Sequence, residues 1–512
     1  MPTKPCRLTC ALTPISVVLA AVLLGGCSSD PAKKPSGDPL TDLRNPSLAI
    51  AQRAKAIEDG WADMLAGKGN QVETREAYRS MMRATNAPLE IRLRAADKLV
   101  QDTDPAELAV TREGVRLLVA REPTEGMRVY LSEVAARNQW AELVPALVTS
   151  WARPSARVDD LARPEWLAIK RLRPGVPPTT IAFEVMLNPP AEAGVAAADW
   201  EARTRTAAWE LLNRLDETGT ARATLLASEI THPVSPGSRQ LLDLLRQCYN
   251  ELNCIPRTKE EVRWLESLLD TRNADNAQWW GDSARLVSGL TPEQRVGLRL
   301  CHIEALRAMA MRRPDMVAMG RAELMSELES RIAPRRTVQR TQRAGPGVSA
   351  FREGLTHWAD KLAWGDLLAA LAVDDALAQP EILERLFAQR DEDNQDNTTE
   401  YGGVLYLGEG EFAATMFAPR SAERPGDDQF VASADMISLS DRGLAHYHFH
   451  AQELSNGSFA GPSLADIQYA ARYARVCVSL TSIARERMDA DVYLPSGAVI
   501  DLGVFERAQG GG

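Results

Sequence analysis

The chain has 512 residues, of which 45% are hydrophobic and 25% are charged, and its formal net charge is −10 at pH 7. One hydrophobic core rarely organises so long a chain, so we expect several domains with the composition of a globular protein. The acidic balance argues against nucleic acid as a partner, because binding to phosphates requires a basic surface.

The first residues have the features of a secretion signal. Two basic residues precede an apolar run over 11–24, and these 14 residues are too few to span a bilayer. The run ends in Leu-Gly-Gly-Cys27 before a polar segment. This pattern resembles the lipobox of bacterial lipoproteins, which implies a signal peptide over 1–26, a lipid on Cys27 and a flexible tether over 27–45. The alternative is an ordinary secretory signal with an incidental cysteine.

The lipoprotein resemblance implies a location in the cell envelope. Cys27 would anchor the protein to a bacterial membrane, with the rest of the chain facing the periplasm or the exterior. Ser28, directly after that cysteine, favours the outer membrane. In such an oxidising compartment Cys248 and Cys254 could form a disulfide, and the sequence leaves open whether they do.

The region from 46 to 330 has the period of amphipathic helices. Leu, Val, Ala and Trp recur at three- and four-residue spacing, and prolines separate the segments. Such short helices cannot bury an apolar face alone, so they must stack. The region loosely resembles HEAT-like helical hairpins, which implies an all-α, solenoid-like scaffold for a partner. A single irregular helical domain with a supporting role is the competing interpretation, and no repeat period can be assigned.

The composition and the hydrophobic pattern of the sequence change after this helical region. A basic segment at 331–349 is expected to be a solvated linker, with contact to anionic lipid or an acidic partner as the alternative. Connecting helices are expected over 350–378, and a further helix over 380–390. Strand-like runs then follow at 401–408, 410–418, 435–440, 444–451, 476–483, 491–494 and 498–505. With one helix at about 463–475, they predict a small α/β domain over 379–509.

Three of the six histidines alternate within the stretch HYHFHA, as His446, His448 and His450. Alternate side chains of a strand project from the same face, so two of these imidazoles can reach one metal ion. A carboxylate such as Asp466 would complete the ligand set of a catalytic zinc site. The structural alternative is a solvated edge strand followed by a helix capping box, Ser463-Leu-Ala-Asp466.

These residues together resemble the signature of the JAMM or MPN-type metalloprotease domain. That signature is E-x-x-G-x-L, then His-x-His, then Ser-x-x-Asp, and this chain offers Glu400-Tyr-Gly-Gly-Val-Leu405, His448-Phe-His450 and Ser463-Leu-Ala-Asp466 in the same order. The resemblance covers about 380 to 509 and implies a JAMM/cytidine-deaminase-like α/β fold with a mixed sheet. It further implies Zn²⁺ ligands and catalytic groups, with His448, His450 and Asp466 binding the metal, Glu400 as general base and Ser463 at the oxyanion.

Three features depart from the signature or leave the ligand set open. Ala451 stands where the family usually has proline after the second histidine. The interval of 16 residues from His450 to Asp466 is longer than usual, which implies an inserted loop. His446 is a possible alternative ligand.

The sequence therefore predicts an envelope lipoprotein with a zinc-dependent hydrolase domain that cleaves a peptide or isopeptide amide. The helical region would position a protein substrate or partner, and no motif indicates an organic cofactor. The alternative is a non-catalytic scaffold lipoprotein with a degenerate JAMM-like domain.

Overall fold

The computed structural model of the chain describes residues 34–155, 157–190, 197–231, 234–270, 272–341, 353–427 and 429–507. The predicted signal peptide and Cys27 lie outside the described residues, as does the first part of the predicted tether. Over the described residues the chain is mostly helical and ends in a mixed, six-stranded sheet. None of its described helices is both long and apolar enough to cross a bilayer.

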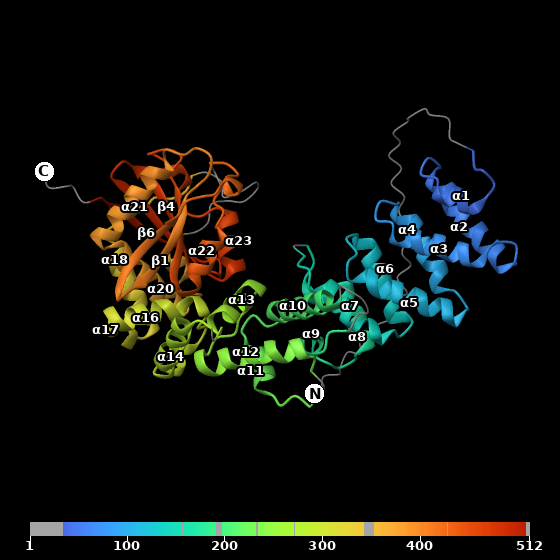
Figure 1. Cartoon of the computed structure of the whole chain (residues 1–512), viewed down its shortest axis with the longest axis horizontal. Helices are drawn as coiled ribbons and strands as arrows, with labels where there is room; N and C mark the ends of the chain where they lie inside the picture. Colours follow the sequence, from blue (N-terminus) through green and yellow to red (C-terminus); the bar gives the residue numbers. More distant parts are fainter. Residues whose placement is uncertain are drawn as a thin grey trace, which may run out of the picture. The chain divides into compact units, whose positions relative to one another are not determined.

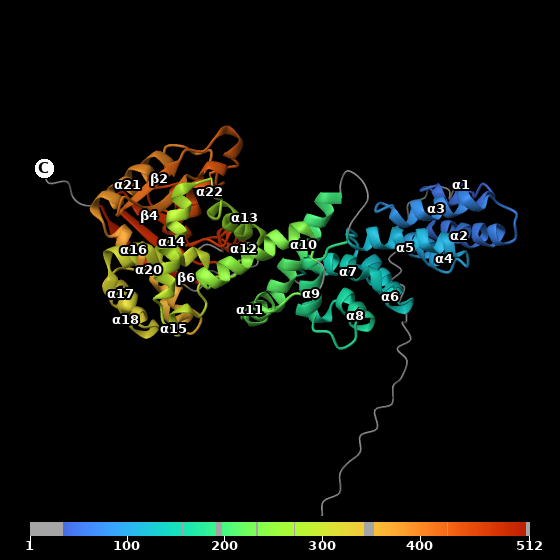
Figure 2. The same cartoon turned by 60° about the horizontal axis from the view of Figure 1, so that its bottom comes forward.

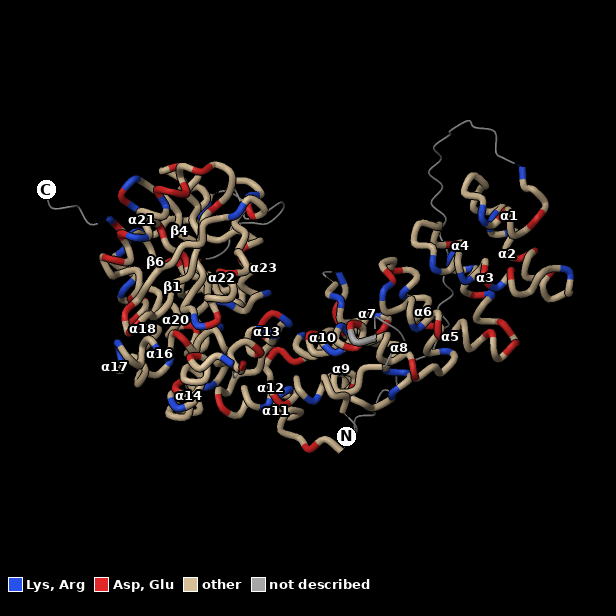
Figure 3. Tube along the Cα trace, in the orientation of Figure 1, with Lys and Arg blue, Asp and Glu red and all other residues tan. Residues whose placement is uncertain are grey.

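The chain divides into two compact units, Met1–Gly114 and Val115–Gly512. The helices of the first unit are α1 (Pro39–Arg44), α2 (Ile50–Leu65), α3 (Gln71–Arg83), α4 (Leu89–Val100) and the start of α5 (Pro105–Val119). Helix α1 packs on α2, and α3 packs on α4. Basic and acidic residues are interspersed along the helices of both units (Figure 3).

The second unit begins with helices that pack mostly on near neighbours in sequence, such as α6 on α8 and α9 on α10. They are α6 (Glu125–Arg137), α7 (Val144–Trp151), α8 (Pro164–Leu172), α9 (Pro178–Leu187), α10 (Ala197–Leu215), α11 (Thr220–Ala227) and α12 (Pro236–Leu252). The helical character predicted for 46–330 is confirmed, whereas the HEAT-like arrangement stays a prediction. Cys248 and Cys254 are both buried, free thiols.

The following helices share one hydrophobic core with the C-terminal sheet. They are α13 (Lys259–Leu268), α14 (Ala274–Ser288), α15 (Pro292–Arg295), α16 (Ile303–Arg312), α17 (Pro314–Ala318), α18 (Arg321–Ile332), α19 (Leu355–Trp358), α20 (Trp364–Leu377) and α21 (Pro380–Asp393). Helix α20 is buried on nearly every side, because its sequence is apolar all round, and α16 lies beside it (Figure 2). The core runs from Cys248 to Phe505, so no core boundary separates a scaffold ending at 330 from the sheet.

The basic segment expected as a solvated linker at 331–349 makes contacts within the second unit over its described part, although most of the described residues are exposed. Arg331 forms ion pairs within this unit, including one of 3.2 Å to Asp374. The backbone N–H of Val504 donates a 2.9 Å hydrogen bond to the carbonyl of Arg336. These contacts fix the described part of the segment alongside the last strand of the sheet.

The sheet has the strand order β2-β1-β3-β4-β5-β6. Its strands are β1 (Gly402–Gly408), β2 (Glu411–Phe417), β3 (Gly443–His450), β4 (Cys477–Ala484), β5 (Arg487–Tyr493) and β6 (Val499–Glu506). Neighbouring strands are antiparallel except β3 and β4, which are parallel and joined through helix α23 (Leu464–Tyr473). A crossover helix of this kind is what a parallel pair requires.

One predicted strand is wrong. Residues 435–439 lie in a helix, α22 (Ala434–Leu439), whose first turn is capped by the Ser433 side chain, and Ser440 begins the short 3-10 helix that follows. Only Met436 of this helix is buried, so the run DMISLS does not supply the apolar face of a strand. The other six strands are confirmed, as are the helices predicted at 380–390 and about 463–475.

The two faces of the sheet are covered differently. Tyr447 and Phe449 of β3 belong to the large hydrophobic core, and the Tyr447 hydroxyl donates to Gln389 of α21. His446 of β3 points to the opposite face, where its ring nitrogen Nδ1 lies 2.8 Å from the Tyr469 hydroxyl of α23. Figure 1 shows α21 and α23 on opposite sides of the strands. The alternation of β3 therefore places the histidines under α23.

We predict that Trp264→Ala destabilises the sheet, although Trp264 lies in α13. Its indole N–H donates to the Asp441 carbonyl at 2.9 Å, and the Arg475 guanidinium lies 3.4 Å from its ring centroid. Loss of this buried ring should cost about 3–5 kcal/mol and speed hydrogen exchange in β3 and β4. Trp61→Ala in the first unit is the control, and unchanged exchange in Trp264→Ala would contradict a shared core.

Candidate metal centre

The site is built on the last residues of β3. His448 and His450 are buried, and their Nε2 atoms lie 3.1 Å apart. The Oδ2 atom of Asp466 lies 3.6 Å from the first of these nitrogens and 3.9 Å from the second. Two imidazoles thus converge on one point with a carboxylate that follows them by 16 and 18 residues along the chain.

Asp466 is held at the histidines by the cap of α23. The Ser463 hydroxyl accepts a 3.3 Å hydrogen bond from the Asp466 backbone N–H, and the Ser463 backbone N–H donates to Asp466 Oδ2 at 2.7 Å. This is the capping box expected as the structural alternative. The two interpretations are compatible, because the same box that starts the helix fixes the carboxylate beside the imidazoles.

Glu400 approaches from the chain that leads into β1. Its carboxylate and the ring nitrogens of His448 and His450 lie within 4.8 Å of one another, so the three residues form a group that could hold a metal ion. Gly402 pairs with His448 across the sheet, and a Cβ there would come within 2.5 Å of the Phe430 ring. Glycine therefore lets Phe430 stack on the His448 ring, with centroids 5.5 Å apart.

The hydrogen bonds of the rings direct lone pairs toward the centre. His450 Nδ1 lies 3.0 Å from the Phe459 carbonyl, which only accepts hydrogen bonds, so Nδ1 carries the proton and Nε2 is a bare acceptor. His448 Nδ1 lies 3.3 Å from the Tyr493 hydroxyl. Two Nε2 atoms at 3.1 Å then need a proton or a cation between them. A carbonyl behind the ring is the usual support of a metal-binding histidine.

The charges of the site follow from burial and proximity. Burial, together with the neighbouring His448, lowers the pKa of His450 to about 3. Burial also disfavours the charged form of His448, but the negative charges of Asp466 and Glu400 outweigh it and raise that pKa. Burial raises the pKa of Asp466, and the charge of His448 outweighs this and lowers it. Asp466 is therefore ionised and His450 neutral near pH 7, as metal ligands must be, whereas a metal ion would have to displace the proton that the raised pKa of His448 favours.

The donor set fits a tetrahedral zinc ion. With bonds of about 2.0–2.1 Å, two ligands of tetrahedral Zn²⁺ are separated by about 3.3–3.4 Å. The separation of 3.1 Å between the imidazole nitrogens and those of 3.6 and 3.9 Å to Asp466 bracket this value. A cavity of about 510 Å³ adjoins the ligands, and Glu400, Phe430, His450, Ser463 and Asp466 are among its lining residues.

His446, the possible alternative ligand, lies on the same face but outside this group. Its Nδ1 faces Tyr469, and its Nε2 is buried without a hydrogen-bond partner. Burial, and then the positive charge of Arg475, lower its pKa well below the usual value. His446 is thus held neutral in the wall beneath α23.

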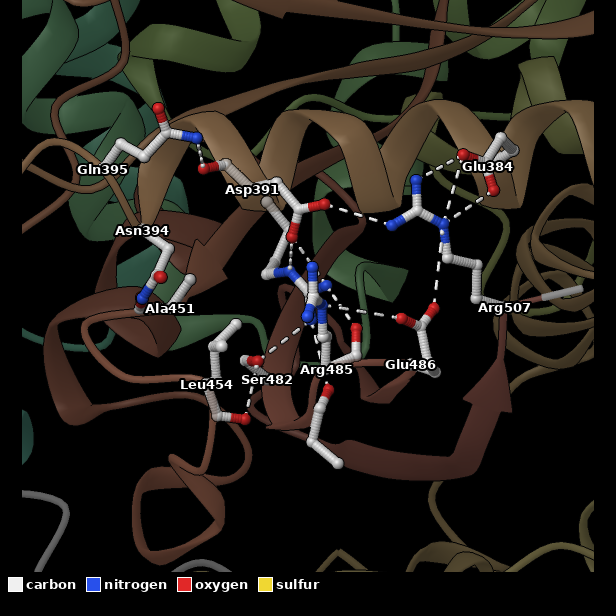
Figure 4. A network of polar contacts seen from close by, with 12 residues as sticks. Glu384, Asp391, Asn394, Gln395, Ala451, Leu454, Ser482, Arg485, Glu486 and Arg507 are labelled. Carbon is white, nitrogen blue, oxygen red and sulfur yellow. Dashed lines mark hydrogen bonds and ion pairs between the residues drawn. The ribbon is translucent and has the colours of Figure 1, made fainter. Parts of the chain in front are cut away.

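The loop after β3 contributes residues that the motif does not name. Gln452 donates a 2.8 Å hydrogen bond to Glu400 Oε1 and so orients that carboxylate. The loop is tied down at both sides, since Asn394 donates to the Ala451 carbonyl and Ser482 to the Leu454 carbonyl (Figure 4). The polar residues after HYHFHA indicate a loop in the sequence. They do not indicate that the glutamine of this loop, Gln452, contacts Glu400.

A second buried carboxyl lies behind Glu400. Asp393, at the end of α21, accepts a 3.0 Å hydrogen bond from the Tyr401 backbone N–H. Burial, and then the charge of Glu400, raise the pKa of Asp393 to about 8. This carboxyl is largely protonated at pH 7, so it adds little negative charge beside Glu400. The sequence does not indicate this buried carboxyl behind Glu400, because Asp393 is one of several acidic residues at the end of its helix.

Comparison with known proteins identifies no relative that shares this geometry. The chain has no significant match to a known protein family, a curated protein or a solved structure. The JAMM resemblance therefore rests on the motif residues themselves.

We predict that replacing His446 flattens the pH dependence of stability in mild acid. Because the pKa of His446 is lowered on folding, the unfolded chain binds its proton first, and stability is lost as the pH falls below about 6.5. Between pH 6.5 and 5, denaturant unfolding of His446→Phe should lose about 2 kcal/mol less than the wild type.

Tyr469→Phe is the control for this prediction, because it removes the contact to His446 Nδ1 and keeps the titrating ring. Its pH dependence should follow that of the wild type. Equal slopes for the wild type and His446→Phe would show that His446 does not titrate as its burial requires.

Proposed function

We propose that this protein is a zinc-dependent amide hydrolase with a JAMM-like C-terminal domain. Its substrate would be a peptide or isopeptide bond of a protein. His448, His450 and Asp466 would hold Zn²⁺, Glu400 would act as general base and Ser463 would stabilise the oxyanion. The observation that carries the proposal is the convergence of Glu400, the two imidazoles and Asp466 around one point beside a cavity.

Zn²⁺ on these ligands would supply Lewis acidity, which makes water acidic near neutral pH. Glu400, held by Gln452, would take the proton of the attacking water and deliver it to the leaving amine. Ser463 accepts a hydrogen bond from Asp466 and keeps its own O–H as a donor for negative charge that develops on the substrate oxygen. Each role uses a group that already lies at the centre or lines the cavity.

The remaining parts of the proposal concern location and substrate delivery. Lipidation of Cys27 would anchor the protein to a bacterial membrane, with the outer membrane favoured, and place the centre in the periplasm or outside the cell. The helical region before the sheet would position a protein substrate or partner. If the purified protein binds no metal, the alternative of a non-catalytic scaffold lipoprotein takes the place of the hydrolase.

We predict that the purified chain binds one equivalent of Zn²⁺ through the three proposed ligands. His448→Ala and Asp466→Ala should each weaken binding by more than about 100-fold, because even loss of an outer hydrogen-bond partner of a ligand costs 10–100-fold. Equilibrium dialysis with elemental analysis measures the bound metal. His357→Ala, in α19, is the matched control and should keep the zinc. Zinc that survives both ligand substitutions would refute the assignment.

We predict that Glu400→Gln keeps the zinc and loses turnover. Glutamine preserves the size of the side chain but cannot accept a proton, so hydrolysis of a mixed peptide library should fall by about 10²–10⁴-fold, as mass spectrometry would show. Loss of zinc in this variant would instead make Glu400 a metal ligand. Unchanged hydrolysis would exclude Glu400 as the base.

A further inference from the structure

Three further carboxylates meet on the same face of the sheet, on β5 and β6, with strand β4 between them and the histidine pair. Asp489 and Asp491 of β5 and Asp501 of β6 each offer an oxygen within 4.8 Å of the other two. Asp489 and Asp491 are 0% exposed and Asp501 is 6% exposed. The alternating acids of MDADVYL were not recognised in the sequence, although they follow the same two-residue spacing as the histidines.

A β-bulge brings the third carboxylate to the other two. Along β5 and β6 the register shifts between Ala490 and Asp491, so that Asp491 pairs with Asp501 while Ala490 pairs with Gly503. Gly503 has a φ of +84°, which glycine adopts without strain. Bulges of this kind redirect side chains. Here the bulge turns Asp501 toward Asp491.

Most polar side-chain atoms of the cluster lack a hydrogen-bond partner within the described part of the chain. All four carboxylate oxygens of Asp489 and Asp491 are buried without one, whereas Asp501 Oδ1 accepts a 2.7 Å hydrogen bond from the Gly503 backbone N–H. On the neighbouring strand β4, Ser479 pairs with Asp491 and Thr481 with Asp489. Both hydroxyls are 0% exposed and also lack a partner. Paired residues of a sheet share a face, so these hydroxyls lie beside the carboxylates. Buried polar groups are rarely left unsatisfied, which indicates a missing ligand.

A fourth carboxyl closes the cluster from outside the sheet. Glu353 has a buried Oε1 without a hydrogen-bond partner, and its backbone carbonyl accepts a 3.0 Å hydrogen bond from Asp501 N–H. Gly461, with a φ of +72°, packs against it. A Cβ on Gly461 would lie 2.5 Å from Glu353 Oε1 and 3.6 Å from Asp491 Cγ. The loop before α23 therefore fits over the acids only because it has no side chain there.

Among the residues that the structure describes, no basic side chain forms an ion pair with these acids, although the positive charge of Arg336 acts on Asp489 and that of Arg340 on Asp491. The guanidinium of Arg340 lies near the cluster, but it donates to the carbonyls of residues 459, 460 and 461. Burial, and then the charges of neighbouring acids, raise the pKa of Asp489 to about 8 and that of Glu353 to about 7. Burial of an uncompensated charge is costly, and a bound cation removes that cost.

We propose that Asp489, Asp491 and Asp501, with Ser479 and Thr481 beside them, form a second metal site that takes a hard divalent cation. All of the donors are oxygen atoms, which favours Ca²⁺, Mg²⁺ or Mn²⁺ over zinc. Oxygen ligands of Ca²⁺ at about 2.3–2.6 Å lie up to about 5 Å apart, which matches the spacing of the cluster. This site shares no ligand with the histidine centre and does not depend on its proposed activity, although Ser479 and Thr481 of β4 also pair with His448 and His450 of β3.

The cation would hold together the last strands of the sheet. It would bridge β5 to β6 and neutralise the acids beneath Gly461. The loop that contains Gly461 also contains Phe459, whose carbonyl faces His450. Occupancy of the acidic site would therefore stabilise the support of the histidine centre without contributing a ligand to it.

The test uses the full chain, stripped with a chelator and titrated at pH 8 with Ca²⁺, Mg²⁺ and Mn²⁺ in separate experiments. We expect one equivalent of Ca²⁺ by equilibrium dialysis. At about a hundredfold excess over Kd the melting temperature should rise by about 4 °C. Asp491→Asn should abolish both effects, and Ser479→Ala should weaken binding. No stoichiometric binding of any of the three cations at millimolar concentration would overturn the proposal.

Two controls separate this site from the rest of the molecule. Asp374→Asn changes an equally buried acid that is paired with Arg331, and should keep the Ca²⁺-dependent shift. His448→Ala should also keep it, whereas loss of Ca²⁺ in that variant would assign the ion to the histidine centre. Without cation, Asp491→Asn should be at least as stable as the stripped wild type. A less stable variant would indicate a hydrogen-bonded structural cluster and contradict the proposal.

Discussion

The two-residue alternation of β3 is the constraint on which both the core and the candidate centre depend. Tyr447 and Phe449 enter the large hydrophobic core, so the residues between them must face α23. A slip of one residue would bury the imidazoles in that core and expose the aromatic rings to the cavity. The close packing of the core on one face therefore determines the positions of the histidine side chains on the other face.

The sequence specified the site better than its surroundings. His448, His450 and Asp466 could be predicted as a group, because their spacing follows from strand and helix geometry, whereas Glu400 was predicted only from the resemblance to the JAMM signature. Gln452, Asp393 and the Phe459 carbonyl could not, because their positions depend on how loops return to the sheet. The hydrophobic core that the helices share with the sheet could not be predicted for a related reason: α20 is apolar all round, which shows that it is buried but not against what.

The face of the sheet under α23 is buried although most of its side chains are polar or charged. Its small apolar cluster, Ala470, Cys477, Tyr493 and Val499, occupies one end, and the rest consists of histidines, hydroxyls and acids. Such a face costs stability unless its charges are balanced. The opposite face, packed on α20 and α21, supplies the burial that offsets this cost. A sheet with one stabilising face and one polar face is suited to ion binding.

The loop between His450 and Asp466 positions several groups of the candidate centre. The residues of this interval form the loop that contains Gln452, Phe459 and Gly461. Gln452 holds Glu400, the Phe459 carbonyl sets the tautomer of His450, and Gly461 covers Glu353. A shorter loop between strand and helix would place Asp466 equally well, because the capping box alone orients it. The loop therefore orients the other groups of the centre, and it links that centre to the acids of β5 and β6.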